Sequence, residues 1–352
     1  MQRFFLNIPL TALVILFSAV LPPEAFGGSV PSMYVVLLGD FLPGASASEI
    51  ISKRGYSYLF DGVRNQTRGM DTIFLNLETP LSRRGHALEK KTYTFRSSPD
   101  VAAVLRQERV FAVHLANNHI LDFGVEALAD TFSNLKRAGV AYAGAGQNWY
   151  EASLPALVNT PVGKVRFVAF SNTLPESYWA KRDRPGTLYG SQKAVVTTLS
   201  RHRGTGPLVA SFHWGAELMT EPKEYQVDLA RLAIDSGATL VVGHHPHVPQ
   251  PIDVYNGVPI LYSLGNFAFG SYSKRAPYGL MAIAEFDEGG RCTLLEIYPL
   301  NTDNSQVAFS PRPVTGPEGQ EIFNTLVEGI DLSQASILWD GEKGVIVPKG
   351  ER

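Results

Sequence analysis

The stretch from Leu240 to Phe269, LVVGHHPHVPQPIDVYNGVPILYSLGNFAF, determines how the rest of the chain is interpreted. It opens with a short apolar run that predicts a buried strand ending at a glycine. His244, His245 and His247 follow, with a proline between the last two. Because proline restricts the backbone and neutral imidazole is the commonest metal ligand, His245 and His247 are predicted to face one metal. A histidine-rich surface loop is the alternative interpretation.

Composition narrows the class of protein. The chain has 352 residues, 45% of them hydrophobic, which is enough to bury a large core. Its net charge is −2 with 18% charged residues and no basic run, so we expect no nucleic-acid partner. Cys292 is the only cysteine, which excludes an intrachain disulfide framework and a thiolate metal cluster.

The N-terminus has the pattern of an export segment. Arg3 precedes a mostly apolar run over residues 8–21, and small residues follow at Ala25 and Gly27. The apolar run is too short for a typical spanning helix, so we predict a signal peptide over residues 1–27 and a periplasmic or extracellular protein. An uncleaved segment that holds the protein at the membrane is the alternative.

Polar candidates for chemistry recur where predicted strands end. The strands are predicted over residues 33–38, 72–77, 110–115 and 208–212. They lead into Asp40, Glu78, the Asn117-Asn118-His119 cluster and His213, respectively. Such residues suit the carboxyl edge of a sheet, where α/β proteins bind ligands. Asp40 alone could instead be a turn former.

The remaining elements are predicted from periodicity and from Gly and Pro positions. Residues 171–190 are irregular and are predicted to form either a lid over a substrate or a solvated connection. The other predicted elements are helices at 101–108, 125–138, 224–234 and 318–330, and strands at 165–170, 260–263, 279–286 and 292–299.

The candidate ligands favour a catalytic rather than a structural metal. Carboxylate, amide oxygen and imidazole without thiolate suit Mn, Fe or Zn, and one or two divalent ions could bind with Glu78 as a bridge. Such a centre activates water for hydrolysis. His119 is then free to act as general acid, with Asp122 orienting it.

The same residues carry a family resemblance over about residues 34 to 270. The series GDFLPG, NLETPL, LANNHILDFG, HWGAE, GHHPHVPQPIDVYNG and YSLGNFAF resembles the capsule-synthesis CapA family. These poly-γ-glutamate synthesis proteins are related to the calcineurin-like metallophosphoesterases. The resemblance implies an α/β fold, a four-layer α-β-β-α sandwich of metallophosphoesterase type, spanning residues 30–300. Residues 301–352 would be a C-terminal extension of unknown role.

Site residues follow from the resemblance position by position. It implies that Glu78 bridges the metals, that Asn118 is a ligand, and that the adjacent His119 is the general acid. The implied metal ligands are Asp40, Glu78, Asn118, His213, His245 and His247. Further residues of the motif blocks are predicted to contact substrate, namely Asn117, Trp214, Gln250 and Asn266.

One departure from the wider metallophosphoesterase pattern concerns the first block. That block is usually Asp-x-His, but Asp40 is followed by Phe41 and Leu42. One imidazole ligand is therefore missing, and the site could hold a single ion unless another group takes that place.

Two functions remain open from the sequence. The residues favour an exported metal-dependent hydrolase that cleaves a phosphoester or an amide of a cell-surface polymer. The resemblance also implies a non-catalytic accessory subunit of a membrane complex that makes or exports an anionic polymer such as poly-γ-glutamate. A periplasmic binding protein is a third alternative. No Walker-type loop is present, so the chain is not expected to make the polymer alone.

Overall fold

The computed structural model describes residues 32–350 except residues 90 and 273. The predicted signal peptide lies outside the described residues. Contacts group the described chain into one compact unit. Within it, no helix combines the length and the apolar character needed to cross a bilayer.

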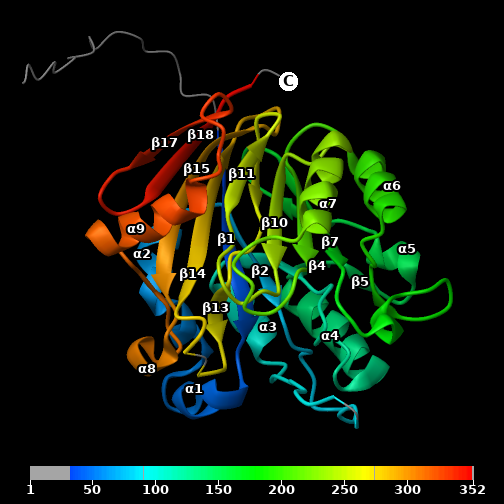
Figure 1. Cartoon of the computed structure of the whole chain (residues 1–352). Helices are drawn as coiled ribbons and strands as arrows, with labels where there is room; N and C mark the ends of the chain where they lie inside the picture. Colours follow the sequence, from blue (N-terminus) through cyan, green and yellow to red (C-terminus); the bar gives the residue numbers. More distant parts are fainter. Residues whose placement is uncertain (1–31, 90, 273, 351–352) are drawn as a thin grey trace, which may run out of the picture. The chain divides into compact units, whose positions relative to one another are not determined.

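The first sheet contains ten strands and is built around β1 (Met33–Leu42) (Figure 1). Four neighbouring strands run parallel in the order β1, β2 (Thr72–Leu77), β3 (Val110–His114) and β4 (Ala141–Ala143). On the other side of β1 the strands are antiparallel, namely β14 (Tyr278–Phe286), β15 (Cys292–Asn301), β18 (Gly344–Pro348) and β17 (Ala335–Trp339). Two short strands pair with β1 and β15, namely β13 (Asn266–Phe269) and β16 (Arg312–Pro313).

The second sheet contains six strands. Its order is β11 (Ile252–Tyr255), β12 (Val258–Leu261), β10 (Leu240–His244), β9 (Leu208–His213), β7 (Lys164–Ser171) and β6 (Ala156–Asn159). The central four strands are parallel, and the two outer strands are antiparallel to their neighbours. A small separate sheet pairs β5 (Ala145–Gly146) with β8 (Gly186–Thr187).

The two sheets pack face to face through alternating side chains. Along β1, Val35 and Leu37 join the core between the sheets, whereas Val36 and Leu38 join the core under the first helical layer. Successive strand residues point to opposite faces, so one apolar run supplies two cores. Phe74 of β2 stacks on Phe167 of β7 across the interface, with ring centroids 4.3 Å apart.

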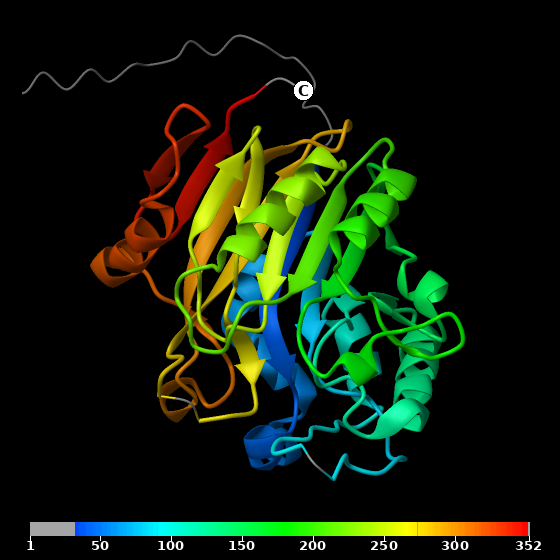
Figure 2. The ribbon, with the colours of Figure 1, turned by 45° about the vertical axis from the view of Figure 1, so that its right-hand side comes forward.

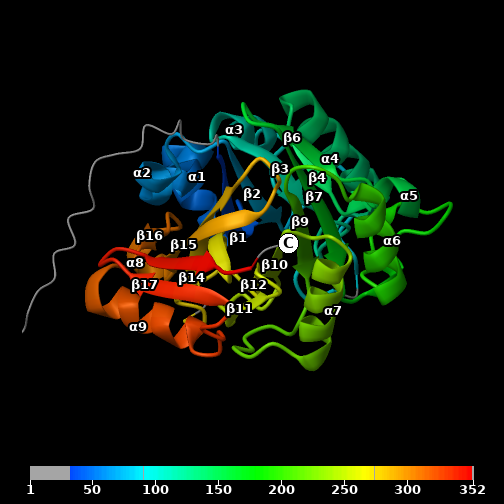
Figure 3. The same ribbon diagram turned by 90° about the horizontal axis from the view of Figure 1, so that it is seen from above.

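Helices cover both outer faces. The first sheet carries α1 (Ser48–Arg54), α2 (Arg64–Thr67), α3 (Val101–Gln107), α4 (Gly124–Ala138) and the 3₁₀ segment Tyr56–Val63. The second carries α5 (Trp149–Ala152), α6 (Gln192–His202) and α7 (Glu224–Asp235), as Figure 2 shows for α6 and α7. Seen from above, α1 to α4 lie along one side and α7 along the other, with strands between them (Figure 3). The predicted four-layer α-β-β-α arrangement is confirmed.

The C-terminal residues complete the first sheet. β18 pairs with β15, and α9 (Gly316–Val327) places Phe323 and Leu326 in the core between the sheets. Gly344 is packed so closely that an added Cβ would lie 2.0 Å from the Phe323 ring. Residues 301–350 therefore belong to the same compact unit as the preceding domain rather than extending from it.

Strand register brings polar residues into line at one edge of each sheet. In the first sheet Asp40 lies beside Asn76, and Asn76 beside His114. In the second sheet His213 lies between Ser171 and His244. Because these strands are parallel, their carboxyl ends meet at one end of the sandwich, which positions the site.

Candidate metal centre

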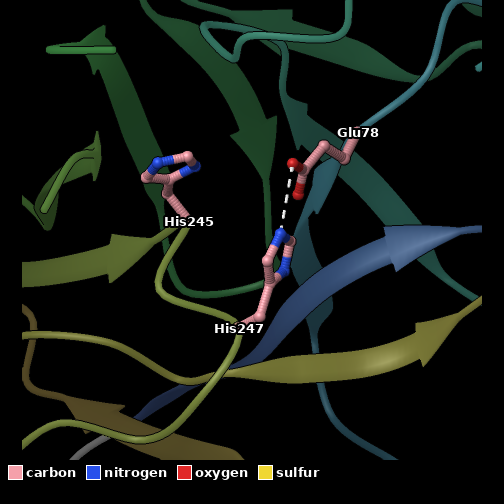
Figure 4. Close-up of side chains that lie close together, drawn as sticks. All are labelled: Glu78, His245 and His247. Atoms are coloured by element: carbon pink, nitrogen blue, oxygen red, sulfur yellow. Dashed lines mark ion pairs between the residues drawn. The ribbon is translucent and has the colours of Figure 1, made fainter. Parts of the chain in front are cut away.

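The candidate ligands come from both sheets and converge. Asp40 lies near the end of β1, Glu78 directly follows β2, and His213 ends β9. His245 and His247 lie in the loop after β10, and Figure 4 shows their rings beside the Glu78 carboxylate. Except for His245 and His247, which share one loop, these residues are far apart in sequence, and the packing of the two sheets brings them together.

The Glu78 carboxylate is at the centre of this group. Its Oε1 lies 3.7 Å from His213 Nε2 and 3.9 Å from both His119 Nε2 and His247 Nε2. Glu78 has no solvent exposure, and Oε1 has no hydrogen-bond partner. A buried acceptor without a partner is costly, and a cation would satisfy it.

Two sets of ligand atoms are close enough to hold an ion. Atoms of Glu78, His245 and His247 lie within 4.8 Å of one another, as do those of Asp40, Glu78 and His213. Glu78 belongs to both sets, as a bridging ligand does. His245 Nδ1 is also buried without a partner. The unsatisfied Glu78 and His245 atoms and the mixed oxygen and nitrogen donors fit a divalent cation.

Asn118 joins the same centre from the loop after β3. Its Oδ1 lies 2.8 Å from His213 Nε2, so the amide oxygen lies beside the imidazole at the candidate metal centre. The predicted ligands Asp40, Glu78, Asn118, His213, His245 and His247 are thus brought together by the fold. Their binding of metal stays a prediction.

Asp40 is held in place by donors from both sheets. Asn76 Nδ2 donates to Oδ1 at 2.8 Å, and the His245 N–H donates to Oδ2 at 3.2 Å. His247 Nδ1 lies 3.1 Å from Oδ2, and His244 Nδ1 lies 3.6 Å from Oδ1. Burial alone would raise the pKa of Asp40, but the hydrogen bond and charge of His247 together with His244 and Asn76 lower it to about 2.

The histidines of the centre differ in the direction of their pKa shifts. Burial holds the pKa of His213 well below its usual range, and burial with the charge of His247 lowers the pKa of His245 to about 3. Burial opposes protonation of His247 as well, but Glu78 and Asp40 raise its pKa to about 9. Burial and the charge of Asp40 raise the pKa of Glu78. His213 and His245 are therefore neutral and ready to ligate, whereas His247 is protonated between two carboxylates in the metal-free protein and must release that proton for Nε2 to ligate.

The loop after β10 is strained where it presents its ligands. His245 has φ 96° and His247 has φ 60°, a region that residues with a side chain rarely adopt. The preceding Gly243 packs against β12, and a Cβ there would lie 1.9 Å from the Tyr262 carbonyl oxygen. The close packing places this strand end, and the strained turn aims both rings inward.

His119 and Asp122 are arranged as an oriented acid. His119 Nδ1 lies 2.7 Å from Asp122 Oδ2, which leaves Nε2 facing Glu78. Asp122 also accepts hydrogen bonds from the Phe95 N–H at 2.8 Å and from the Tyr178 hydroxyl at 3.0 Å. Lys91 Nζ is 2.5 Å from Asp122 Oδ1 and also donates to the Asn118 carbonyl oxygen. Asp122 thus contacts the His119 ring, and the catalytic role of the pair stays a prediction.

Three residues of the site were missed by the sequence analysis. Asn76 donates to Asp40 and to Glu78 Oε2 at 3.0 Å, and it interrupts an otherwise apolar strand, which could have revealed it. His114 is buried between the sheets, 2.8 Å from Ser211 Oγ and 2.9 Å from the Ala116 carbonyl oxygen. Lys91 lies in a charged connection, and nothing in its local sequence distinguishes it.

The structure corrects three of the four predicted substrate contacts. Asn117, Trp214 and Gln250 have no exposed surface. Asn117 donates to Asn76 Oδ1 at 2.9 Å and to the Leu77 carbonyl oxygen at 2.8 Å, so it braces the strand ends.

Trp214 and Gln250 are likewise internal. Trp214 Nε1 donates to the Tyr262 carbonyl oxygen at 2.8 Å, and its ring stacks on Phe212 in the core under α6 and α7. Gln250 Nε2 donates to the Met219 carbonyl oxygen at 3.0 Å. At Trp214 and Gln250 the motif residues therefore serve internal packing and hydrogen bonding.

The fourth predicted contact lies at the centre. Asn266 Oδ1 is 3.0 Å from His247 Nδ1, and the residue lines a cavity.

The departure at Phe41 and Leu42 from the Asp-x-His pattern also has a structural counterpart, since both are buried and Phe41 packs against Phe60 and Phe267. Neither can replace the missing imidazole.

Two cavities open onto the centre. The larger, about 1030 Å³, reaches Asn118 and His245 and extends between the starts of α6 and α7. The smaller, about 400 Å³, reaches His119 and His247. The candidate centre is therefore accessible from two directions, as a site for a substrate must be.

Three proteins of known name are similar to this chain in sequence. Capsule biosynthesis protein CapA from Bacillus anthracis is 28% identical over 289 residues, covering 80% of this chain and 69% of that protein. PGA biosynthesis protein CapA from Bacillus subtilis (strain 168) is 29% identical over 235 residues, 66% of this chain and 62% of that one. A probable polyglutamine synthesis accessory protein from Mycobacterium tuberculosis is 36% identical over 258 residues, 67% of each chain.

A solved structure shares the fold. The crystal structure described as a novel phosphatase from Mycoplasma pneumoniae matches with a TM-score of 0.51 at 14% identity, covering 79% of this chain and 97% of that one. At this identity the likeness concerns the fold alone, and it agrees with the four-layer sandwich described above. The family model described as bacterial capsule synthesis protein PGA_cap matches residues 34–271. The chain therefore belongs to the bacterial capsule synthesis protein PGA_cap family.

Proposed function

We propose that this protein is an exported, metal-dependent hydrolase that serves capsule or poly-γ-glutamate synthesis by cleaving a phosphoester or amide bond. One observation carries the proposal. Glu78 Oε1 is buried without a hydrogen-bond partner and is surrounded by imidazole nitrogens of His119, His213 and His247 at 3.7 to 3.9 Å. A polar group left unsatisfied among such ligands indicates a cation site rather than a structural network.

The ligand set suits Mn, Fe or Zn, held by Asp40, Glu78, Asn118, His213, His245 and His247. When bound, a divalent cation polarises the scissile group and makes a nearby water more acidic. His119 presents Nε2 to the same space and would protonate the leaving group. Asp122 keeps that ring oriented through Nδ1.

The cellular setting is part of the proposal. We place the protein outside the cytoplasm, in the periplasm or the extracellular space, either free or held at the membrane by its N-terminal segment. Its partners would be an anionic cell-surface polymer or a precursor of it, and a membrane synthesis complex. The names of the relatives, which refer to capsule, PGA and polyglutamine synthesis, support this setting.

Metal content tests the proposal directly. Mass spectrometry should find one or two ions per chain in the wild type and fewer in His245→Ala and His247→Ala. The matched control is His86→Ala, which removes an exposed histidine. Hydrolysis of phosphoester and amide probes should fall at least about tenfold with loss of a ligand. Absence of bound metal after exposure to Mn, Fe and Zn would refute the proposal.

A non-catalytic accessory subunit is the second candidate. It is favoured by the relative that is named as an accessory protein. In cells, the two candidates differ in the effect of His245→Ala. An accessory subunit should support normal polymer formation with this variant, provided that it folds, whereas a hydrolase required for the pathway should not.

A further inference from the structure

Glu217 lies where both cavities meet, and nothing so far gives it a role. It follows β9 in the loop leading to α7, and its side chain is exposed. It lines the larger cavity together with Asn118 and His245, and the smaller cavity together with His119 and His247. Because both cavities reach candidate ligands, Glu217 lies on the solvent side of the candidate metal centre.

The Glu217 carboxylate is free to act. Within residues 32–350, leaving aside 90 and 273, its side chain makes no hydrogen bond and no ion pair. It lies outside both sets of candidate ligand atoms. Its charge reaches the centre, because it adds to the effects of burial and Asp40 in raising the pKa of Glu78.

The charge around the centre limits the substrates that suit it. The ligand set contains two carboxylates, Asp40 and Glu78, which one divalent ion would balance. The Asp122 charge is compensated by Lys91. With one ion bound, Glu217 then leaves a negative charge at the entrance from the larger cavity, whereas Arg275 also lines the smaller cavity. This negative charge repels a doubly charged phosphomonoester but not a neutral amide.

Positive charge lies farther out in the larger cavity. Lys193 and Lys223 line it near the first turns of α6 and α7, and neither makes an ion pair within the described part of the chain. Asp228 of α7 also lines this cavity, so the lining apart from Glu217 carries one net positive charge. Backbone N–H groups at helix starts add partial positive charge. Carboxylates that flank a scissile amide would therefore bind away from Glu217.

We propose that Glu217 is the general base of the centre and that the substrate is an amide whose neighbouring carboxylates bind beside Lys193 and Lys223. This inference rests on the proposed function. The Glu217 carboxylate takes a proton from water as the water oxygen bonds to the carbonyl carbon, and protonated His119 gives its proton to the amide nitrogen as the C–N bond breaks. The proton held by Glu217 then returns to His119. The second water proton leaves with the new carboxyl group and passes to the amine, so the products are a carboxylate and an ammonium.

The test compares Glu217→Gln with the wild type as full-length, metal-loaded chains. Free amine released from a poly-γ-glutamate oligomer reports amide cleavage, and p-nitrophenyl phosphate and bis(p-nitrophenyl) phosphate report phosphoester cleavage. Metal content is measured for each variant. The matched control is Glu221→Gln in the same loop, an exposed carboxylate that lines neither cavity.

We expect the wild type and Glu221→Gln to release amine, and Glu217→Gln to lose about 100-fold or more in kcat with unchanged metal content. Equal rates in Glu217→Gln and the wild type would overturn the inference, and so would loss of metal from Glu217→Gln. Cleavage of phosphoesters without amides would overturn it while leaving the proposed hydrolase intact. Bound metal without cleavage of any probe would refute the hydrolase and the inference together.

Discussion

Replacing Glu78 with Gln should have opposite effects on stability in the metal-free and metal-bound protein. Without metal, Glu78 Oε1 is a buried acceptor with no partner, and burial and Asp40 raise the pKa of the carboxyl group. The Gln carbonyl oxygen can still accept from Asn76 Nδ2, which donates to Oε2 at 3.0 Å. Its amide nitrogen would face His119 Nε2, which lies 3.9 Å from Oε1 and can accept because Nδ1 of the same ring donates to Asp122.

The size of the effect follows from these contacts. Relief of an unsatisfied buried group is worth about 1–3 kcal/mol. Loss of attraction to protonated His247, whose Nε2 is 3.9 Å from Oε1, offsets part of it. We therefore expect Glu78→Gln to stabilise the metal-free protein by about 1–2 kcal/mol, or about 2–4 °C in Tm. The gain should shrink as pH falls below the raised pKa of Glu78, because a protonated carboxyl group is also neutral.

With metal the order should reverse. An ion at 100 times its Kd stabilises the wild type by about 2.7 kcal/mol, and the variant should lose most of this because Glu78 belongs to both candidate ligand sets. Calorimetry in chelator and in excess Mn or Zn measures both values, with Glu221→Gln as control. A metal-free variant less stable than the wild type, or an equal response of both proteins to metal, would refute the reasoning.

Three further predictions concern residues around the centre. Trp214→Phe should lose about 1–3 kcal/mol in urea unfolding, because the Tyr262 carbonyl oxygen loses its buried donor, while metal content stays unchanged. Gly243→Ala should destabilise by about 4 kcal/mol or more and lower metal content, because its Cβ would lie 1.9 Å from the Tyr262 carbonyl oxygen; a normal Tm would contradict this. Lys91→Ala should keep its metal but lower turnover about tenfold on any cleaved probe, because the contact that pairs with Asp122 is lost; unchanged kcat would show that Lys91 is dispensable.

Strands with a continuous apolar run were predictable from local sequence. The strand predicted over residues 72–77 is β2, and all six of its residues are buried. A short, mostly apolar and β-branched run favours a strand enclosed on both faces, and a polar residue at its end is expected at the sheet edge. For this reason Asp40, Glu78 and His213 were found without knowledge of their partners.

Other elements had weaker local patterns. The sequence analysis did not predict α6, and it treated residues 171–190 as irregular, although Tyr178 from that span contacts Asp122. The strands β17 and β18 were also missed, because exposed and half-buried residues alternate irregularly along β17. Their place at the edge of the sheet depends on pairing with β15, which is a long-range contact.

The sequence by itself determined which residue types stand at the strand ends and hence most of the candidate ligand set, whereas the four-layer fold is what the family resemblance of its motifs implied. Local patterns suffice there, because strands buried on both faces are mostly apolar and polar residues follow at their ends. Only the tertiary structure decided which polar residues face the centre. It buried Trp214 and Gln250, brought Lys91 to Asp122, and placed Glu217 between two cavities. Those outcomes depend on the packing of one sheet against the other and on loops between them, and no short segment of sequence contains that information.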